Sequence, residues 1–227
     1  MDEARLREAA REARHEAAPF AAAILVANVT LAVVSERLGW QLFGRSDWWL
    51  WLVVGAPSAL LVLIFLVGPQ RLGLDHLRRE VASVTLGLLW LGTTAGVACV
   101  IVSLMHWRPS GGQLLASAAV VLFTNVVTFS LVFWELDSGG PVKRALAASR
   151  IRPDFQFPQD ENRELARPGW APALVDYLYL SLTNSVAFSP TDAMPLTHQA
   201  KLVMGLEASI SLVTILVVGA RAINVLG

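Results

Sequence analysis

The chain has 227 residues, of which 55% are hydrophobic and only 16% are charged, whereas soluble globular domains carry about 25% charged residues. Its 18 basic and 18 acidic side chains cancel, so the net charge gives no indication of a nucleic-acid partner. The single cysteine, Cys99, excludes an intrachain disulfide and a C-x-x-C metal site. The composition indicates an integral membrane protein, with the lipid bilayer as its first partner.

Residues 1–16 are charged and rich in alanine, and we expect them to form a helix outside the membrane. Glu3 and Arg7 are four residues apart, a spacing that supports an exposed helix. The five acidic residues of this segment argue against a mitochondrial transit peptide. We interpret it as a solvated helical cap on the first membrane span; a docking helix for a partner is the alternative.

Five apolar segments are long enough to cross the hydrocarbon core, which takes about 20 helical residues. They are residues 17–35, 48–68, 81–105, 113–134 and 199–225. A shorter and more polar segment, 171–188, is predicted to form a sixth helix that either spans the membrane or re-enters it. We therefore predict an all-α, polytopic transmembrane helical bundle over residues 17–227, with five certain spans.

Two residue types refine the predicted spans. Gly92 and Gly96 have the small-xxx-small spacing that lets a neighbouring helix approach closely. Seven of the eight tryptophans lie near predicted segment ends, where their amphipathic rings are expected at the level of the lipid headgroups. Only Trp90 lies well inside a span.

Residues 138–170 form the one long connection, and we expect it to be cytoplasmic. Gly139, Gly140 and Pro141 end the fourth span, and a short helix is predicted over residues 143–149. Connections of this length are usually functional or disordered. The aromatic side chains of Phe155 and Phe157 predict that this one packs against another part of the protein.

The placement of lysine and arginine predicts the orientation. Thirteen basic residues fall on one side: four in the N-terminal segment, three between the second and third spans, and six in the long connection. The alternate loops hold only Arg37, Arg45 and Arg108. This asymmetry predicts a multi-pass protein of the cell membrane with a cytoplasmic N-terminus.

The last span carries polar residues along one face. Steps of three and four residues connect Lys201, Met204, Glu207, Ser211, Thr214, Val218, Arg221 and Asn224. A carboxylate inside a membrane helix costs roughly 2.5–3.5 kcal/mol on insertion scales, so Glu207 is a candidate functional residue. A hydrogen-bonded packing seam is the alternative, and Arg221 is close enough to the helix end to snorkel to the interface.

Polar residues also occur in the fourth span and in the 171–188 helix. In the fourth span we expect Thr124, Asn125 and Thr128 to hydrogen-bond to other helices. Asp176 is either a first-turn carboxylate favoured by the helix dipole or a site residue. The complete set of candidates for a pore or transport path is Glu207, Ser211, Thr214, Arg221, Asp176, Thr183, Asn184, Ser185 and Asp192.

Residues 176–183, Asp-Tyr-Leu-Tyr-Leu-Ser-Leu-Thr, resemble the pore helix of potassium-channel-type pore modules, and residues 191–207 resemble the stretch that enters the inner helix. The resemblance implies a short helix, a turn and a pore-lining helix. Those channels select ions with the carbonyls of T-V-G-Y-G, whereas residues 183–190 contain no glycine. The Phe-Ser-Pro-Thr-Asp-x-Met-Pro signature at 188–195 is also similar to a family of actinobacterial membrane proteins without an assigned activity.

The sequence contains no H-E-x-x-H, G-x-S-x-G or P-loop motif, and we expect neither an enzyme nor a cofactor or metal. The leading hypothesis is a channel-like or transporter-like membrane protein, with a homo-oligomer as one arrangement to consider. The alternative is a non-conducting scaffold that recruits a cytoplasmic partner through residues 1–16 and 138–170. For the 171–188 helix we favour a sixth span, because re-entry requires shielded backbone at mid-membrane.

Overall fold

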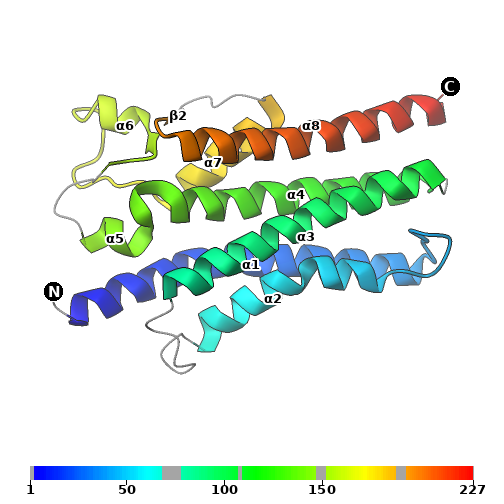
Figure 1. Cartoon of the computed structure of the whole chain (residues 1–227), viewed down its shortest axis with the longest axis horizontal. Helices are drawn as coiled ribbons and strands as arrows, with labels where there is room; N and C mark the ends of the chain where they lie inside the picture. Colours follow the sequence, from blue (N-terminus) through cyan, green and yellow to red (C-terminus); the bar gives the residue numbers. More distant parts are fainter. Residues whose placement is uncertain (1–2, 68–77, 107–108, 147–151, 188–192, 227) are drawn as a thin grey trace. The chain divides into compact units, whose positions relative to one another are not determined.

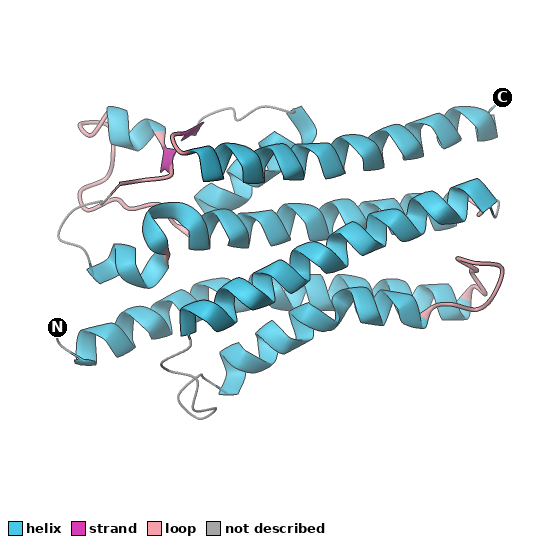
Figure 2. Cartoon of the chain, in the orientation of Figure 1, coloured by secondary structure: helices cyan, strands magenta, loops and turns pink. Residues whose placement is uncertain are grey.

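The computed structural model describes residues 3–67, 78–106, 109–146, 152–187 and 193–226. The elements in chain order are α1 (Glu3–Arg37), α2 (Trp49–Val67), α3 (Arg78–His106), α4 (Gly111–Leu136), η2 (Asp137–Gly139), α5 (Pro141–Leu146), β1 (Phe155–Gln156), α6 (Pro158–Glu161), α7 (Leu174–Ala187), β2 (Met194–Pro195) and α8 (His198–Leu226) (Figure 1). Helices dominate, and the two strands are only two residues each (Figure 2). The predicted all-α class is confirmed.

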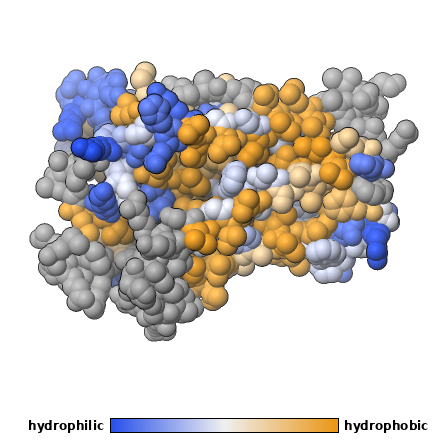
Figure 3. Space-filling view, in the orientation of Figure 1, coloured by the Kyte–Doolittle hydropathy of each residue, from blue (hydrophilic) through white to orange (hydrophobic). Residues whose placement is uncertain are grey.

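Within the described residues, four helices are long and apolar enough to cross a membrane: Glu8–Arg37, Val84–Ser103, Gly111–Leu146 and His198–Gly219. Over Trp49–Phe65, α2 is a shorter apolar helix, so the expected count of five spans is not confirmed. Hydrophobic side chains form much of the described surface of the long helices in the face that Figure 3 shows. These findings indicate a helical membrane-embedded protein.

The chain forms two compact units. The first contains Met1–Ala17 and Phe129–Ser209, and the second contains Ala18–Thr128 and Ile210–Gly227. The boundary of the predicted N-terminal segment, residues 1–16, is close to the first division, yet α1 continues through it and through Pro19 as one helix of 35 residues. The predicted cap and first span are therefore one element.

The second unit has a hydrophobic core and close helix–helix approaches. A Cβ atom on Gly92 would lie 2.8 Å from the backbone oxygen of Val54, so α3 meets α2 at this glycine. Gly96 faces Val54 and Val121, which confirms the predicted close approach of another helix. The core residues are Leu31, Ala32, Leu42, Trp51, Val97, Val100, Leu114 and Val121.

Trp51 corrects one expectation. Its side chain is 1% exposed and belongs to this core, whereas the sequence placed it among the rings at the headgroup level. Trp134, at the end of the fourth predicted span, is also buried, at 6% exposed, so proximity to a segment end is not sufficient to put a tryptophan at the surface. Trp49, which neighbours Trp51, is exposed, as expected for a ring at a membrane boundary.

Of the three polar residues of the fourth span that were predicted to bond to other helices, Thr124 and Asn125 do so, whereas the buried Thr128 hydroxyl has no hydrogen-bond partner among the described residues. The Asn28 side chain on α1 donates to the Thr124 hydroxyl at 3.3 Å, and Asn125 donates to the Ser211 hydroxyl on α8 at 2.9 Å.

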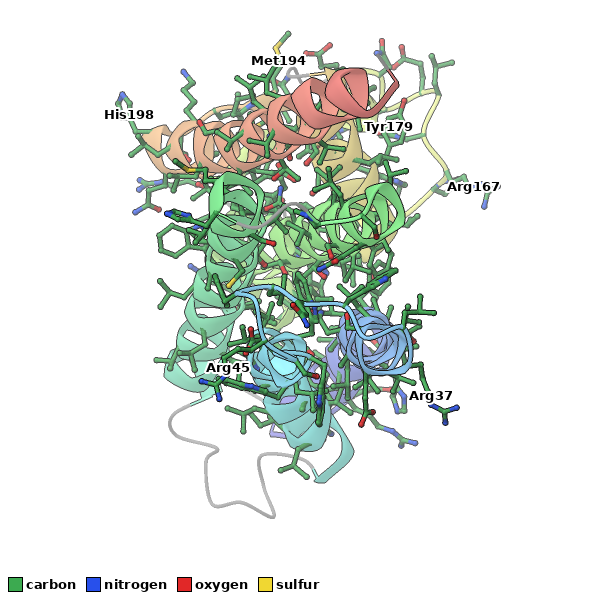
Figure 4. The ribbon with its side chains drawn as sticks, turned by 90° about the vertical axis from the view of Figure 1, so that its right-hand side faces the viewer. Arg37, Arg45, Arg167, Tyr179, Met194 and His198 are labelled. Carbon is green, nitrogen blue, oxygen red and sulfur yellow. The ribbon has the colours of Figure 1, made fainter. Side chains whose placement is uncertain are left out.

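Among the basic residues that the sequence assigned to the alternate loops, Arg37 and Arg45 are exposed (Figure 4).

The first unit is built around the long connection. β1 pairs with β2 in antiparallel register, with Phe155 opposite Pro195. Phe155 and Phe157 are buried and contact Tyr177 of α7, with ring centroids 6.3 and 5.4 Å away. The prediction that this aromatic pair packs on another element is confirmed. The predicted short helix at 143–149 corresponds to α5, and residues 147–149 lie outside the described residues.

Candidate functional site

Glu207 lies on α8 in the first unit, and its side chain is 0% exposed. Ser181 and Ser185 of α7 donate their hydroxyl hydrogens to its Oε1 atom, the second at 3.0 Å. Asn184 donates to Oε2 from its Nδ2 atom at 2.7 Å. The carboxylate therefore lies among neutral side-chain donors, which we call the Glu207 site: Ser181, Asn184, Ser185 and Glu207.

The sequence of α7 explains this convergence. Residues 181, 184 and 185 follow the i, i+3, i+4 spacing that puts side chains on one helix face, and all three are buried. The opposite side of α7 is apolar and exposed at Val175, Leu182 and Val186. One face of α7 is therefore built for a polar partner and the other for an apolar environment.

These contacts explain how a carboxylate is tolerated here. An isolated carboxylate in an apolar medium is very unfavourable, and hydrogen bonds to it are worth about 1.5–3 kcal/mol each. Three donors offset much of that cost. Asn184 is itself held because its Nδ2 atom also donates to the Met204 backbone oxygen at 3.0 Å.

A second buried carboxylate, Asp137, fixes the entrance to α7. Its Oδ1 atom accepts hydrogen bonds from the backbone N–H groups of Asp154 at 2.7 Å and Phe155 at 3.3 Å. Its Oδ2 atom accepts from the Tyr177 hydroxyl at 2.6 Å. Asp137 therefore joins the end of α4, the long connection and the first turns of α7.

Asp154 extends this network to α8. Its Oδ1 atom accepts from the Thr197 hydroxyl at 2.7 Å, and its backbone oxygen accepts from Leu196 at 2.8 Å. Thr197 in turn accepts from the backbone N–H of Ala200 at 3.2 Å, which is the geometry of an N-cap. We call Asp137, Asp154, Tyr177 and Thr197 the Asp137 network.

The Asp137 network brings the start of α7 and the start of α8 to the same end of the unit (Figure 1). Phe155 contacts Tyr177, near the start of α7, and also pairs with Pro195, which precedes α8. The chain thus passes along α7 to Ala187 and is back beside the beginning of α7 by Pro195. At 14 residues, α7 is about 21 Å long at 1.5 Å per residue.

The structure places the predicted site residues in different settings. Asn184 and Ser185 contact Glu207, as described. Asp176 accepts from the backbone N–H of Ala173 at 2.8 Å, which supports its interpretation as a first-turn carboxylate. The Thr183 hydroxyl donates to the Tyr179 backbone oxygen of its own helix at 3.0 Å.

The remaining candidates do not join this site in the described structure. Ser211 and Thr214 belong to the second unit, where Ser211 accepts from Asn125 and Thr214 donates to the backbone oxygen of Ile210. Asp192 and the Arg221 side chain lie outside the described residues.

Sequence reasoning missed Ser181 and the members of the Asp137 network. Ser181 could have been found from its i+3 and i+4 relation to Asn184 and Ser185. Asp137 and Asp154 gave no such signal, because most of their partners, backbone N–H groups and side-chain hydroxyls, are distant in sequence. Among described residues there is no group of three or more His, Cys, Asp or Glu side chains that could hold a metal ion.

No protein-family model, curated protein or solved structure matches the chain. The class is therefore taken from the molecule itself: four apolar helices of membrane length indicate a helical membrane-embedded protein. The resemblance to potassium-channel-type pore modules stays a prediction from the sequence, as does the likeness to the actinobacterial family.

Proposed function

We propose that the protein is a channel-like or transporter-like membrane protein in which α7 is a re-entrant helix and Glu207 lines the transport path. The observation that carries this proposal is the fully buried Glu207 carboxylate on a membrane-length helix, surrounded by neutral side-chain donors. Ionisable residues inside membrane helices mark transport paths by default, because their insertion is unfavourable.

The geometry of α7 supports re-entry over the sixth span that the sequence favoured. A helix of 14 residues is shorter than the ~20 residues that cross a ~30 Å core. The segments before and after it meet near Tyr177. A chain that enters and leaves at one end of a helix does not cross the membrane with it.

The same geometry agrees with the charge asymmetry of the sequence. Leu174, at the start of α7, donates its backbone N–H to the Glu16 side chain of α1. The two most basic segments, the N-terminal part of α1 and the long connection, therefore lie at the same end of the first unit. We place that end in the cytoplasm, following the positive-inside rule.

Flux through liposomes tests the proposal. The protein is reconstituted and assayed separately for proton, sodium and potassium flux, with Glu207→Gln as the variant and Ser209→Ala as the control. Ser209 is exposed on the same helix, where its hydroxyl donates to the Gly205 backbone oxygen at 2.7 Å. We expect wild-type flux of at least one ion, a loss of about tenfold or more in Glu207→Gln, equivalent to 1.4 kcal/mol, and no change in the control.

Absence of flux for all three ions would favour the scaffold alternative. That function has its own support, because the connection after residue 151 is ordered by buried hydrogen bonds and exposes Leu165, which is 82% exposed. A scaffold predicts that Leu165→Asp abolishes recruitment of a cytoplasmic protein to the membrane while the variant remains folded.

A further inference from the structure

The geometry of the Glu207 site points to a proton as its ligand: we propose that the Oε1 atom of Glu207 binds and releases the proton that the protein transports. This inference rests on the transport function proposed above and names its substrate. It follows from which atoms face the carboxylate and how they can turn.

The side chains that donate to Glu207 favour a proton over a metal ion as the bound species. A sodium ion or another hard cation binds to the lone pairs of several oxygens. Here Ser181 and Ser185 direct their hydroxyl hydrogens at Oε1, and Asn184 directs an N–H at Oε2 from 2.7 Å. A metal ion would have to displace the Asn184 amide from Oε2 and turn the serine hydroxyls away from Oε1, whereas a proton needs only one hydroxyl to turn and no additional volume.

The two carboxylate oxygens are not equivalent. Asn184 faces Oε2 with an amide N–H, which donates and cannot accept, and its other hydrogen bond, to Met204, holds it in that orientation. Oε1 faces two hydroxyls, and a hydroxyl can donate or accept. A carboxylic acid whose hydrogen is on Oε1 can therefore donate to Ser181 or Ser185, while Oε2 still accepts from Asn184.

Proton binding at Glu207 needs no reactant other than a hydronium ion. A hydronium ion transfers its proton to Oε1 and leaves as water, and the carboxylate becomes a neutral carboxylic acid. The serine that now accepts from this acid turns its own hydrogen to the backbone oxygen four residues earlier, Tyr177 for Ser181 or Ser181 for Ser185. Thr183 already makes this bond to Tyr179 in the same helix, at 3.0 Å. Release reverses these steps.

Several other titratable side chains of the first unit are exposed or have hydrogen-bond partners of their own. Tyr179 and Lys201 are exposed, and Asp137 and Tyr177 bond to each other. Asp176 bonds to the first turn of its own helix. Besides Glu207, the titratable side chains on α4, η2, α7 and α8 within this unit are Glu135, Asp137, Asp176, Tyr177, Tyr179, His198 and Lys201. The three donors to Glu207 are drawn from none of them.

Infrared difference spectroscopy on the purified full chain in lipid tests the assignment. The carbonyl stretch of a protonated carboxylic acid is separate from both carboxylate bands. Across a pH series in potassium buffer, we expect the wild-type spectrum minus that of Glu207→Gln to contain such a band at low pH, and this band disappears as the pH rises. Ser181→Ala and Ser185→Ala should each shift the band, because each removes a partner of Oε1. Thr183→Ala is the matched control on α7 and should leave it unchanged.

Three results would overturn the inference: no acid band in the wild-type minus Glu207→Gln difference at any pH, a difference band that does not change with pH, or a difference band that sodium abolishes at constant pH. The last would mean that the site exchanges a metal cation instead. The infrared signal does not depend on flux. If Glu207 titrates but no flux is found, the proposed transport is rejected and the proton site is retained. If sodium flux is found but Glu207 does not titrate, the proton site is rejected and the proposed transport is retained.

Discussion

The first unit contains two fully buried carboxylates that are held in different ways. Asp137 accepts from the backbone N–H groups of Asp154 and Phe155 and from the Tyr177 hydroxyl. Glu207 accepts from two serine hydroxyls and an asparagine amide, all on side chains of one helix.

We infer from this difference that Asp137 is a structural anchor and that Glu207 is an exchangeable site. Two of the donors to Asp137 are backbone N–H groups, which donate in a fixed direction and cannot accept, so they hold its Oδ1 atom as an acceptor. The hydroxyls of Ser138 and Tyr177 also donate to Asp137. Serine hydroxyls can turn and accept, so Glu207 can have two states within the same backbone. The buried charge alone does not distinguish a structural carboxylate from a functional one; the donors do.

Removal of the anchor should have the largest effect on stability. Asp137→Ala leaves several buried donors without an acceptor, and each such loss costs about 1–3 kcal/mol, so we expect more than about 3 kcal/mol in total. Asp160→Ala is the matched control. Asp160 accepts the backbone N–H of Phe157 at 2.9 Å in the same connection, and its loss should cost only about 1 kcal/mol.

Unfolding in detergent, followed by helical circular dichroism, measures both Asp137→Ala and Asp160→Ala. Equal destabilisation by the two variants would contradict the role of Asp137 as the anchor of this unit.

Tyr177→Phe should have an intermediate effect. The ring contacts with Phe155 and Phe157 and the Arg144 guanidinium 5.3 Å from the ring remain, while the hydrogen bond to Asp137 is lost. We expect a decrease of about 1.5–3 kcal/mol in the free energy of unfolding, the range for a hydrogen bond to a charged group. A change below the error of the same unfolding measurement would show that the hydroxyl contributes little to the anchor.

The smallest effect on stability is expected at the Glu207 site. Ser185→Ala removes one of two hydroxyls at Oε1, and Ser181 remains, so we expect about 0.5–1.5 kcal/mol. A cost as large as that of Asp137→Ala would mean that Glu207 is also a fixed anchor, and the distinction between the two carboxylates would be lost.

The helices could be predicted from the sequence, because long apolar runs identify them without knowledge of their neighbours. The last predicted span, 199–225, agrees with α8 at His198–Leu226, and Glu207 was found because a carboxylate in such a run is unusual. The partners of Glu207 could not be predicted. They depend on how α7 is aligned against α8. The pairing of β1 with β2 and the Asp137 network set this alignment, and these contacts join residues that are 17 to 43 positions apart in the sequence.

The return of the chain to the start of α7 could not be predicted for the same reason, and the preference for a sixth span stays a prediction. Local hydrophobicity over residues 171–188 is compatible with both topologies. The pairing of Phe155 with Pro195 brings the chain back to the start of α7, and this contact has no local signature in the sequence.

Labelling of single cysteines from one side of the membrane tests the re-entrant helix most directly. In a Cys99→Ala background, cysteines are placed at Leu165 and Met194, which precede and follow α7 and are 82% and 63% exposed, and at Ser46, in the exposed loop after α1 (Figure 4 shows Met194). An impermeant maleimide is added to intact cells and to inverted vesicles. Re-entry predicts that the Leu165 and Met194 positions react from the same side and the Ser46 position from the other. Reaction of the Met194 position from the Ser46 side would show that α7 crosses the membrane and would contradict the account.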